Sequence, residues 1–110
     1  MDLDPLSAVV GKDTSLCLFR VAQEALNNGS RHAGASAASV TLRRDADGLL
    51  LGVRDDGVGF DPASPGRGRS LGLASMRERA RLVNGTLDIE SAPGRGTSVI
   101  AWVPTEGEAP

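Results

Sequence analysis

The sequence predicts an α+β two-layer sandwich, with helices gathered on one face of a sheet, and three observations indicate this fold class. Apolar residues recur at helical spacing in segments 14–33 and 71–83. Apolar and polar residues alternate in segments 39–55 and 86–103, and each of these contains a turn with glycine. The order helix, strand pair, helix, strand pair is typical of helices packed together on one side of hairpins.

The composition limits the class of function. With 110 residues the chain has the size of one domain. The 12 Lys and Arg against 14 Asp and Glu give a net charge of −2, which argues against nucleic-acid binding by bulk electrostatics. No apolar run approaches the roughly 20 residues that a membrane helix needs, and no export leader opens the chain. We therefore expect a cytoplasmic domain, either free or as the cytoplasmic part of a membrane-anchored protein, that contacts neither nucleic acid nor the membrane directly.

The chain divides into a short N-terminal segment (1–13), one domain (14–104) and a polar tail (105–110). Its single cysteine, Cys17, excludes an internal disulfide and a cysteine metal cluster. Because Cys17 lies in an apolar run (16–19), we expect a buried thiol that packs as a small hydrophobe.

The first predicted helix covers 14–33 and is capped by Asp13 or Thr14. Its expected core positions share one apolar stripe and are Leu16, Phe19, Ala22, Ala25 and Leu26. A second, polar face is spaced by three and four residues and consists of Arg20, Glu24 and Asn28, followed by Arg31 or His32.

The first hairpin, 39–55, turns between Asp45 and Gly48. A loop at 56–70 follows, and the second helix runs over 71–83 until Asn84-Gly85 stops it. Two more strands, 86–91 and 97–103, flank a turn at 93–96. The expected core positions of the second helix are Leu71, Met76, Leu82 and Val83.

Of the 14 glycines, five lie between residues 57 and 72, and two more lie in the turn at 93–96. The segment 55–60 ends a strand with two carboxylates and two glycines, which suits a ligand that approaches the backbone closely. The segment 66–73 leads into a helix, where free N–H groups suit phosphate. A solvated loop with a helix cap fits the same residues. The loop has no Gly-Lys-Ser/Thr, so it is not a Walker loop, and its spacing is not that of a dinucleotide fingerprint.

Glu24 and Asn28 lie one helical turn apart, so a carboxylate and an amide oxygen meet at one place. Oxygen ligands of this kind suit Mg²⁺, and Glu24 alternatively serves as a general base. A solvated helix face with an exposed Arg20–Glu24 pair explains the same residues. His32 by itself carries no chemistry, because no catalytic or metal-ligand spacing surrounds it.

Taken in order, these segments resemble the four motifs of bacterial sensor histidine kinases. The N box resembles segments 23–28 and 31–33, and the first glycine box resembles segment 55–60. The second glycine box resembles segment 70–80, and the final glycine-threonine motif resembles segments 94–97 and 103–104. The stretch Met76-Arg77-Glu78-Arg79 resembles the NarL/DesK-like subfamily, and the resemblance covers about residues 16–104. One departure is Ser70, which stands where the second box usually has a glycine.

The resemblance implies the ATP-binding catalytic domain of the GHKL superfamily, with a mixed, mostly antiparallel sheet covered on one face by helices. It implies that Asn28 holds Mg²⁺ and that Glu24 is the polarising or general-base residue and a possible second metal ligand. It implies that Asp56 accepts a hydrogen bond from the adenine amine. The further residues implied for the adenine end are Gly57, Gly59 and Thr97.

The resemblance also implies which residues lie near the phosphates or ribose, namely Arg31, His32, Leu71, Gly72 and Leu73. Arg67 and Arg69 are candidates for a lid over the phosphates. The cofactors implied are ATP and Mg²⁺.

The implied activity is transfer of the γ-phosphate to a histidine on a separate dimerisation and phosphotransfer domain, with a response regulator as the indirect partner. Segment 1–13 is too short for such a domain, so the chain is either an excised part of a kinase or acts on a partner in trans. Two alternatives remain open. An anti-sigma-factor-type serine kinase is disfavoured by the stretch 76–79, and a non-catalytic ATP-binding switch is disfavoured by the presence of both Glu24 and Asn28.

Overall fold

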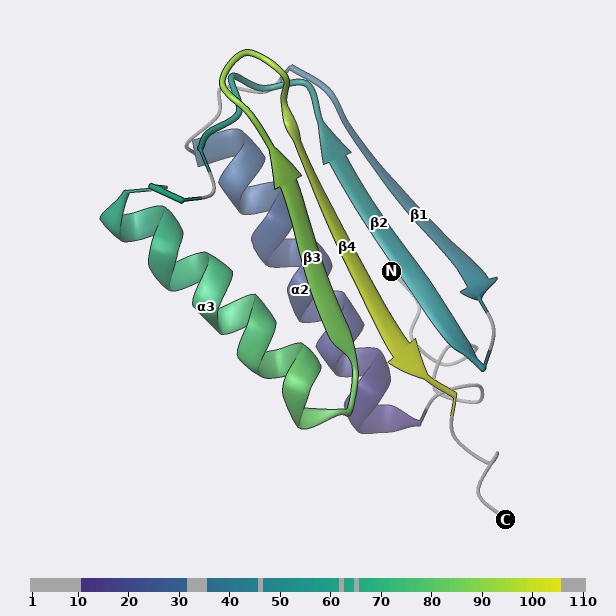
Figure 1. The fold of residues 1–110 in the computed structure, drawn as a ribbon. Helices are drawn as coiled ribbons and strands as arrows, with labels where there is room; N and C mark the ends of the chain where they lie inside the picture. Colours follow the sequence, from purple (N-terminus) through teal and green to yellow (C-terminus); the bar gives the residue numbers. More distant parts are fainter. Residues whose placement is uncertain (1–10, 32–35, 46, 62, 65, 106–110) are drawn as a thin grey trace.

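The computed structural model describes residues 11–31, 36–45, 47–61, 63–64 and 66–105, with only the backbone described at 29–31 and 67–69. In these ranges, two helices cover one face of a four-stranded sheet (Figure 1). The elements in chain order are α2 (Lys12–Arg31), β1 (Ala38–Asp45), β2 (Gly48–Asp55), α3 (Arg67–Leu82), β3 (Thr86–Ser91) and β4 (Thr97–Pro104). None of the helices in this part of the chain combines the length and hydropathy that crossing a bilayer requires. The predicted α+β two-layer sandwich is confirmed.

The sheet has the strand order β1-β2-β4-β3, and its three pairings are antiparallel. In the register, Val53 of β2 lies opposite Val40 of β1 on one side and Val99 of β4 on the other. Both predicted hairpins, β1–β2 and β3–β4, are present, and pairing of β2 with β4 joins them into one sheet. The strands at the centre are therefore β2 and β4.

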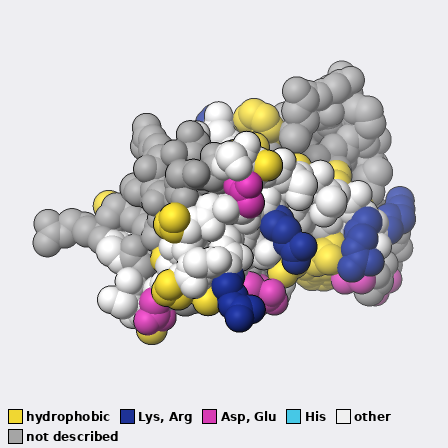
Figure 2. Space-filling model, turned by 90° about the horizontal axis from the view of Figure 1, so that it is seen from above, with side chains coloured by type: hydrophobic (Ala, Val, Ile, Leu, Met, Phe, Trp, Pro, Cys, Tyr) yellow, Lys and Arg dark blue, Asp and Glu magenta, His cyan; other side chains and the backbone are white. Residues whose placement is uncertain are grey.

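The end of the sheet where β2 ends and β4 begins also receives the C-terminal end of α2 and the N-terminal end of α3 (Figure 1). Viewed from this end, side chains of Lys and Arg are interspersed with those of Asp and Glu (Figure 2). The segments in which the sequence predicts chemistry thus come together at one end of the molecule.

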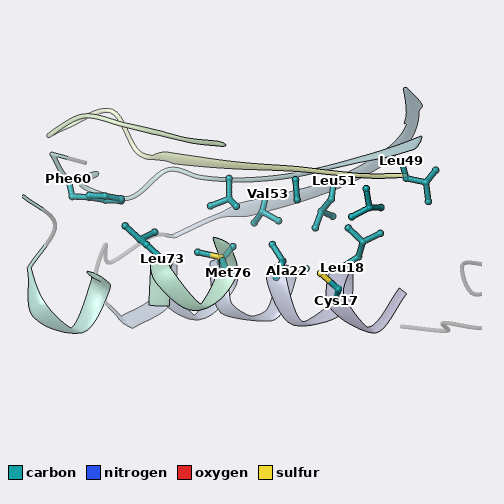
Figure 3. Packing of buried hydrophobic residues seen from close by; sticks show 14 residues of the cluster. Cys17, Leu18, Ala22, Leu49, Leu51, Val53, Phe60, Leu73 and Met76 are labelled. Carbon is teal, nitrogen blue, oxygen red and sulfur yellow. The ribbon is translucent and has the colours of Figure 1, made fainter. Parts of the chain in front are cut away.

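The core lies between the helices and the central strands (Figure 3). Alternate residues of β2 and β4 point toward the helices and are buried, because successive side chains of a strand face opposite sides. These residues are Leu49, Leu51, Val53, Val99, Ala101 and Val103. The helices contribute Cys17, Leu18, Val21, Ala22, Ala25, Leu73 and Met76, and the loop after β2 contributes Phe60.

The buried face of α2 differs from the predicted stripe. Ala22 and Ala25 are buried as predicted, but Leu16 and Leu26 are 46% and 39% exposed. The helix contacts both the sheet and α3, so its buried face is broader than one stripe and includes residues next to the predicted ones. The helix also begins at Lys12, so Asp13 lies in its first turn and neither Asp13 nor Thr14 caps it.

The second helix, α3, begins at Arg67 and not at Leu71. Met76 is fully buried as predicted, whereas Leu71 and Leu82 are 71% and 69% exposed. The buried stripe of α3 is Leu73, Met76 and Ala80. This stripe keeps the spacing of three and four, in a register that excludes both exposed leucines.

The predicted helix stop at Asn84-Gly85 is confirmed and has the geometry of a Schellman motif. The Gly85 amide donates to the Ala80 carbonyl at 2.8 Å, and the Asn84 amide donates to the Arg81 carbonyl at 3.1 Å. Asn84 adopts a left-handed φ of 63°, which asparagine tolerates better than most residues. The motif turns the chain back toward β3.

Cys17 is buried, as predicted. Its thiol donates to the Arg79 carbonyl oxygen of α3 at 3.3 Å. Burial raises the pKa of the Cys17 thiol, and the nearby Arg79 partly opposes this rise. The thiol therefore stays protonated at neutral pH and acts as a packing group between the helices.

The contrast between Met76 and Leu82 gives a stability test. We expect Met76→Ala to lower the free energy of unfolding by about 2–5 kcal/mol, because the substitution leaves a cavity in the core. Leu82→Ala, at a largely exposed position, should change it by about 0.5 kcal/mol or less. Urea denaturation of both variants measures the difference, and equal losses would contradict the assigned register of α3.

Candidate functional site

The two helices come into close contact where Gly72 of α3 faces α2. A side chain at Gly72 would place its Cβ 2.6 Å from Glu24 Oε1 and 3.5 Å from Asn28 Nδ2. Glu24 and Asn28 are half-buried. Because glycine has no side chain here, a carboxylate and an amide one turn apart on α2 lie together against α3.

A groove of about 230 Å³ opens beside Glu24 between the two helices. Its lining is polar and consists of Arg20, Gln23, Glu24, Asn27, Ser75 and Arg79. Arg20 Nη1 donates to Gln23 Oε1 at 3.4 Å. Glu24 therefore borders on polar space on one side and on Gly72 on the other.

The helix-facing row of the sheet continues into polar residues at its end. Asp55 faces the same side of β2 as the buried Leu51 and Val53, because alternate residues of a strand share a face. It is half-buried and lies opposite Thr97 in the β2–β4 register. Asp55 Oδ1 accepts a hydrogen bond from the Gly57 amide at 2.9 Å.

Thr97 is joined to the end of β3 through hydroxyl groups. Its Oγ1 lies 2.9 Å from Ser91 Oγ. Ser91 Oγ also accepts from the Phe60 amide at 2.9 Å and donates to the Gly96 carbonyl at 2.9 Å. This network fixes the loop after β2 to the turn between β3 and β4.

Asp56 points away from the helix-facing row. It is exposed, and its carboxylate accepts from the Ser36 amide at 2.8 Å, the Ser36 hydroxyl at 2.7 Å and the Ala37 amide at 3.0 Å. The Ser36 hydroxyl contributes most to lowering the pKa of Asp56, followed by the Ala37 amide. A lowered folded-state pKa means that these bonds stabilise the fold above the usual pKa of Asp, and the contribution is lost as the pH falls through the lowered value.

Gly59 allows another group to come close to its backbone, and in the structure that group is the Ala92 carbonyl. It has a φ of 69°, and a Cβ at this position would collide with the Ala92 carbonyl oxygen. The Gly94 amide donates to the Val58 carbonyl at 2.5 Å in the same contact. Packing of the loop on the β3–β4 turn therefore explains the glycine at this position, and the contact of Gly59 with the base stays a prediction.

The early start of α3 changes the expected phosphate contacts. The Ser70 amide donates to the Gly66 carbonyl at 2.9 Å, so helical bonding is established before Leu71. Leu71, Gly72 and Leu73 lie within the helix, where amides bond to carbonyls four residues earlier. The predicted use of their amides for phosphate does not hold in this conformation, and the amides free of such bonds belong to the first turn, 67–69.

Several predicted residues lie outside what the structure describes. His32 is outside the described residues, and so are the side chains of Arg31, Arg67 and Arg69.

Within the described ranges, no group of three or more His, Cys, Asp and Glu side chains converges as a metal cluster. The Glu24–Asn28 pair supplies two oxygen-bearing side chains, which fits an ion that keeps most of its shell for phosphate and water.

Sequence reasoning did not select Asp55 or Ser91. The alternation along β2 contains a signal for Asp55, because residues 49, 51, 53 and 55 face the same side. Ser91 is harder to identify from the sequence, because its hydrogen bond with the Phe60 amide joins residues that are far apart along the chain.

Comparisons with known proteins agree with this geometry. Residues 13–107 match the family of histidine kinase-, DNA gyrase B- and HSP90-like ATPases. An uncharacterized sensor-like histidine kinase of Chloroflexus aurantiacus is 43% identical over 88% of this chain and 17% of its own length. The oxygen sensor histidine kinase NreB of Staphylococcus carnosus is 42% identical over 79% of this chain and 25% of its own length. The chain thus spans a quarter or less of these relatives.

Two solved structures share the fold. The histidine kinase domain of the Erythrobacter litoralis blue-light-activated kinase EL346 aligns with a TM-score of 0.64 and 25% identity, over 84% of this chain and 45% of that one. The ATP-binding domain of PrrB from Mycobacterium tuberculosis aligns with a TM-score of 0.66 and 23% identity, over 86% and 68%. With this fold and a match that covers nearly all of its length, the chain belongs to the family of histidine kinase-, DNA gyrase B- and HSP90-like ATPases.

Proposed function

We propose that this chain binds Mg-ATP and transfers the γ-phosphate to a histidine on a separate helical domain of a two-component kinase. The observation that carries the proposal is the contact of Glu24 and Asn28 with Gly72. It places a carboxylate and an amide at the boundary between the helices, at one side of a domain whose family consists of ATPases.

We assign the adenine contact to Asp55 in place of Asp56. A half-buried carboxylate on the helix-facing side accepts from the adenine amine and disfavours guanine, which offers an acceptor there. Asp56 is exposed, and three donors already occupy its oxygens. Thr97 lies opposite Asp55 and is the second residue that we assign to the base.

We assign the metal to Asn28, with Glu24 beside it. Mg²⁺ normally takes one or two protein groups and completes its shell with phosphate and water, and it neutralises charge between the β- and γ-phosphates. Glu24 then takes the proton of the acceptor imidazole as its nitrogen attacks the γ-phosphorus and the bond to the bridging oxygen breaks, releasing ADP.

The first turn of α3 is the proposed phosphate contact, since its amides point out of the helix with the positive end of the dipole. Arg67 and Arg69 of this turn would add positive charge near the phosphates, and we keep Arg31 and His32 as residues that the sequence predicts near the phosphates or ribose.

The names of the relatives support the choice of partner. Because the curated relatives are named as sensor histidine kinases and are much longer than this chain, we propose a histidine-bearing domain as the direct partner and a response regulator as the indirect one. The same names favour histidine over serine as the acceptor. A domain that uses ATP in this pathway would act in the cytoplasm.

A titration with ATP, with and without Mg²⁺, tests the site. Asp55→Asn should weaken binding about 10- to 100-fold in both conditions, because it removes a charge-assisted hydrogen bond. Asn28→Asp should alter only the Mg²⁺-dependent part of the affinity. Isothermal titration calorimetry measures both, with Asp88→Asn, an exposed carboxylate on β3, as the matched control. The proposed site is wrong if neither variant differs from the parent.

Gly72→Ala separates stability from activity. Alanine is favoured over glycine in a helix by about 1 kcal/mol, so the melting temperature should not fall. The added Cβ would displace the Glu24 carboxylate, so formation of phosphohistidine should fall about 10- to 100-fold. Labelled ATP and a histidine-bearing phosphotransfer domain measure the transfer, and Ala74→Ser at an exposed position of α3 is the control. Full activity in Gly72→Ala would rule out the assigned role of this contact.

A further inference from the structure

We propose that Asp56 is a positioning residue that holds the segment 36–37, directly before β1, and does not contact the nucleotide. This inference rests on the proposed function, because the segment follows the helix that carries Glu24 and Asn28. The carboxylate binds two successive residues, Ser36 and Ala37, through three hydrogen bonds.

The contact extends the sheet beyond its last regular pair. The register of β1 and β2 ends at Ala38 and Asp55. One step further, the Asp56 amide donates to the Ala37 carbonyl at 3.2 Å. The backbone bond and the side-chain bonds therefore act on the same dipeptide, and we call this set of contacts the Asp56 latch.

The latch lies at a short distance along the chain from the catalytic helix. Helix α2 ends at Arg31, and the latched residue Ser36 follows five residues later. A step of this length spans at most about 18 Å when fully extended. Fixing Ser36 therefore restricts where the end of α2 can lie.

The neighbouring residue gives the latch its connection to the nucleotide site. Asp55 lies on the helix-facing side of β2, whereas the carboxylate of the next residue, Asp56, binds residues 36–37 at the end of β1. The dipeptide Asp55-Asp56 thus joins the proposed base contact to the chain that leaves α2. Loss of the latch should disturb the phosphate end of the site more than the base end.

The chemistry of asparagine distinguishes the latch from a nucleotide contact. In Asp56→Asn, the amide oxygen still accepts from the two backbone amides, and the amide nitrogen donates to the Ser36 hydroxyl, which also accepts. In Asp56→Ala every one of these bonds is lost. A positioning role predicts that asparagine rescues function, whereas recognition that needs the carboxylate charge predicts that it fails.

The experiment compares Asp56→Ala, Asp56→Asn and Ser36→Ala with Asp88→Ala as the control. Hydrogen exchange at the amides of Ser36 and Ala37 reads the latch directly. The affinity for ATP without Mg²⁺ measures the contacts with the adenine base. The kcat and KM of phosphohistidine formation measure the effect on the phosphate end of the site. We expect Asp56→Ala to expose both amides to exchange and to lower kcat about 3- to 10-fold, with ATP affinity in the absence of Mg²⁺ changed less than about two-fold.

Asp56→Asn and the control should keep amide protection and kcat near those of the parent, and Ser36→Ala should show an intermediate loss. Equal loss of Mg²⁺-free ATP affinity in Asp56→Ala and Asp56→Asn would overturn the proposal, because it would show a nucleotide contact. Unchanged exchange and kcat in Asp56→Ala would also overturn it. If the parent binds no ATP, the proposed function fails and the functional role of the latch fails with it, while amide protection still reports whether the contact itself forms.

Discussion

The site that we propose for this domain depends on the close approach of α2 and α3 at Gly72. A side chain on α3 at this point would occupy the place of the Glu24 carboxylate. The approach is maintained further along the helices, where Cys17 bonds to the Arg79 carbonyl and Met76 is fully buried. The packed helix pair thus places a carboxylate and an amide side by side against α3, and in our proposal this arrangement provides the positioning that phosphoryl transfer needs.

The sheet supplies the second half of the proposed site, because the side chains on the helix-facing side of β2 change from apolar to polar at the end of the strand. Leu51 and Val53 bury apolar surface against the helices, and the same row then reaches Asp55 beside Thr97. The alternation of a strand decides which of two adjacent carboxylates faces the helices. Asp55 and Asp56 consequently have different surroundings and, in our account, different roles: one recognises the base, and the other holds the segment that leaves α2.

Much of the fold was predictable from local patterns. The two hairpins, the stop at Asn84-Gly85 and the shared face of Glu24 and Asn28 depend on turn chemistry and helical spacing. The helix registers were not predictable to the same degree, because each helix packs against both the sheet and the other helix. The hydrophobic residues misassigned to the core for this reason are Leu16, Leu26, Leu71 and Leu82. The start of α3 was missed because the first residues of the helix belong to a glycine-rich segment. The choice of Asp56 for the base relied on the motif alone and did not consider which side of β2 each carboxylate faces.

Mapping the surface that responds to nucleotide tests the central claim most directly. The claim is that ATP lies on the helix-facing side, between the α2–α3 contact and the end of β2. Amide chemical-shift changes on addition of Mg-ATP should concentrate at Glu24, Asn28 and Gly72 and at Asp55 and Thr97. Changes confined to the opposite face of the sheet, where Ser39, Thr41 and Gly52 line a separate cavity of about 280 Å³, would contradict the account.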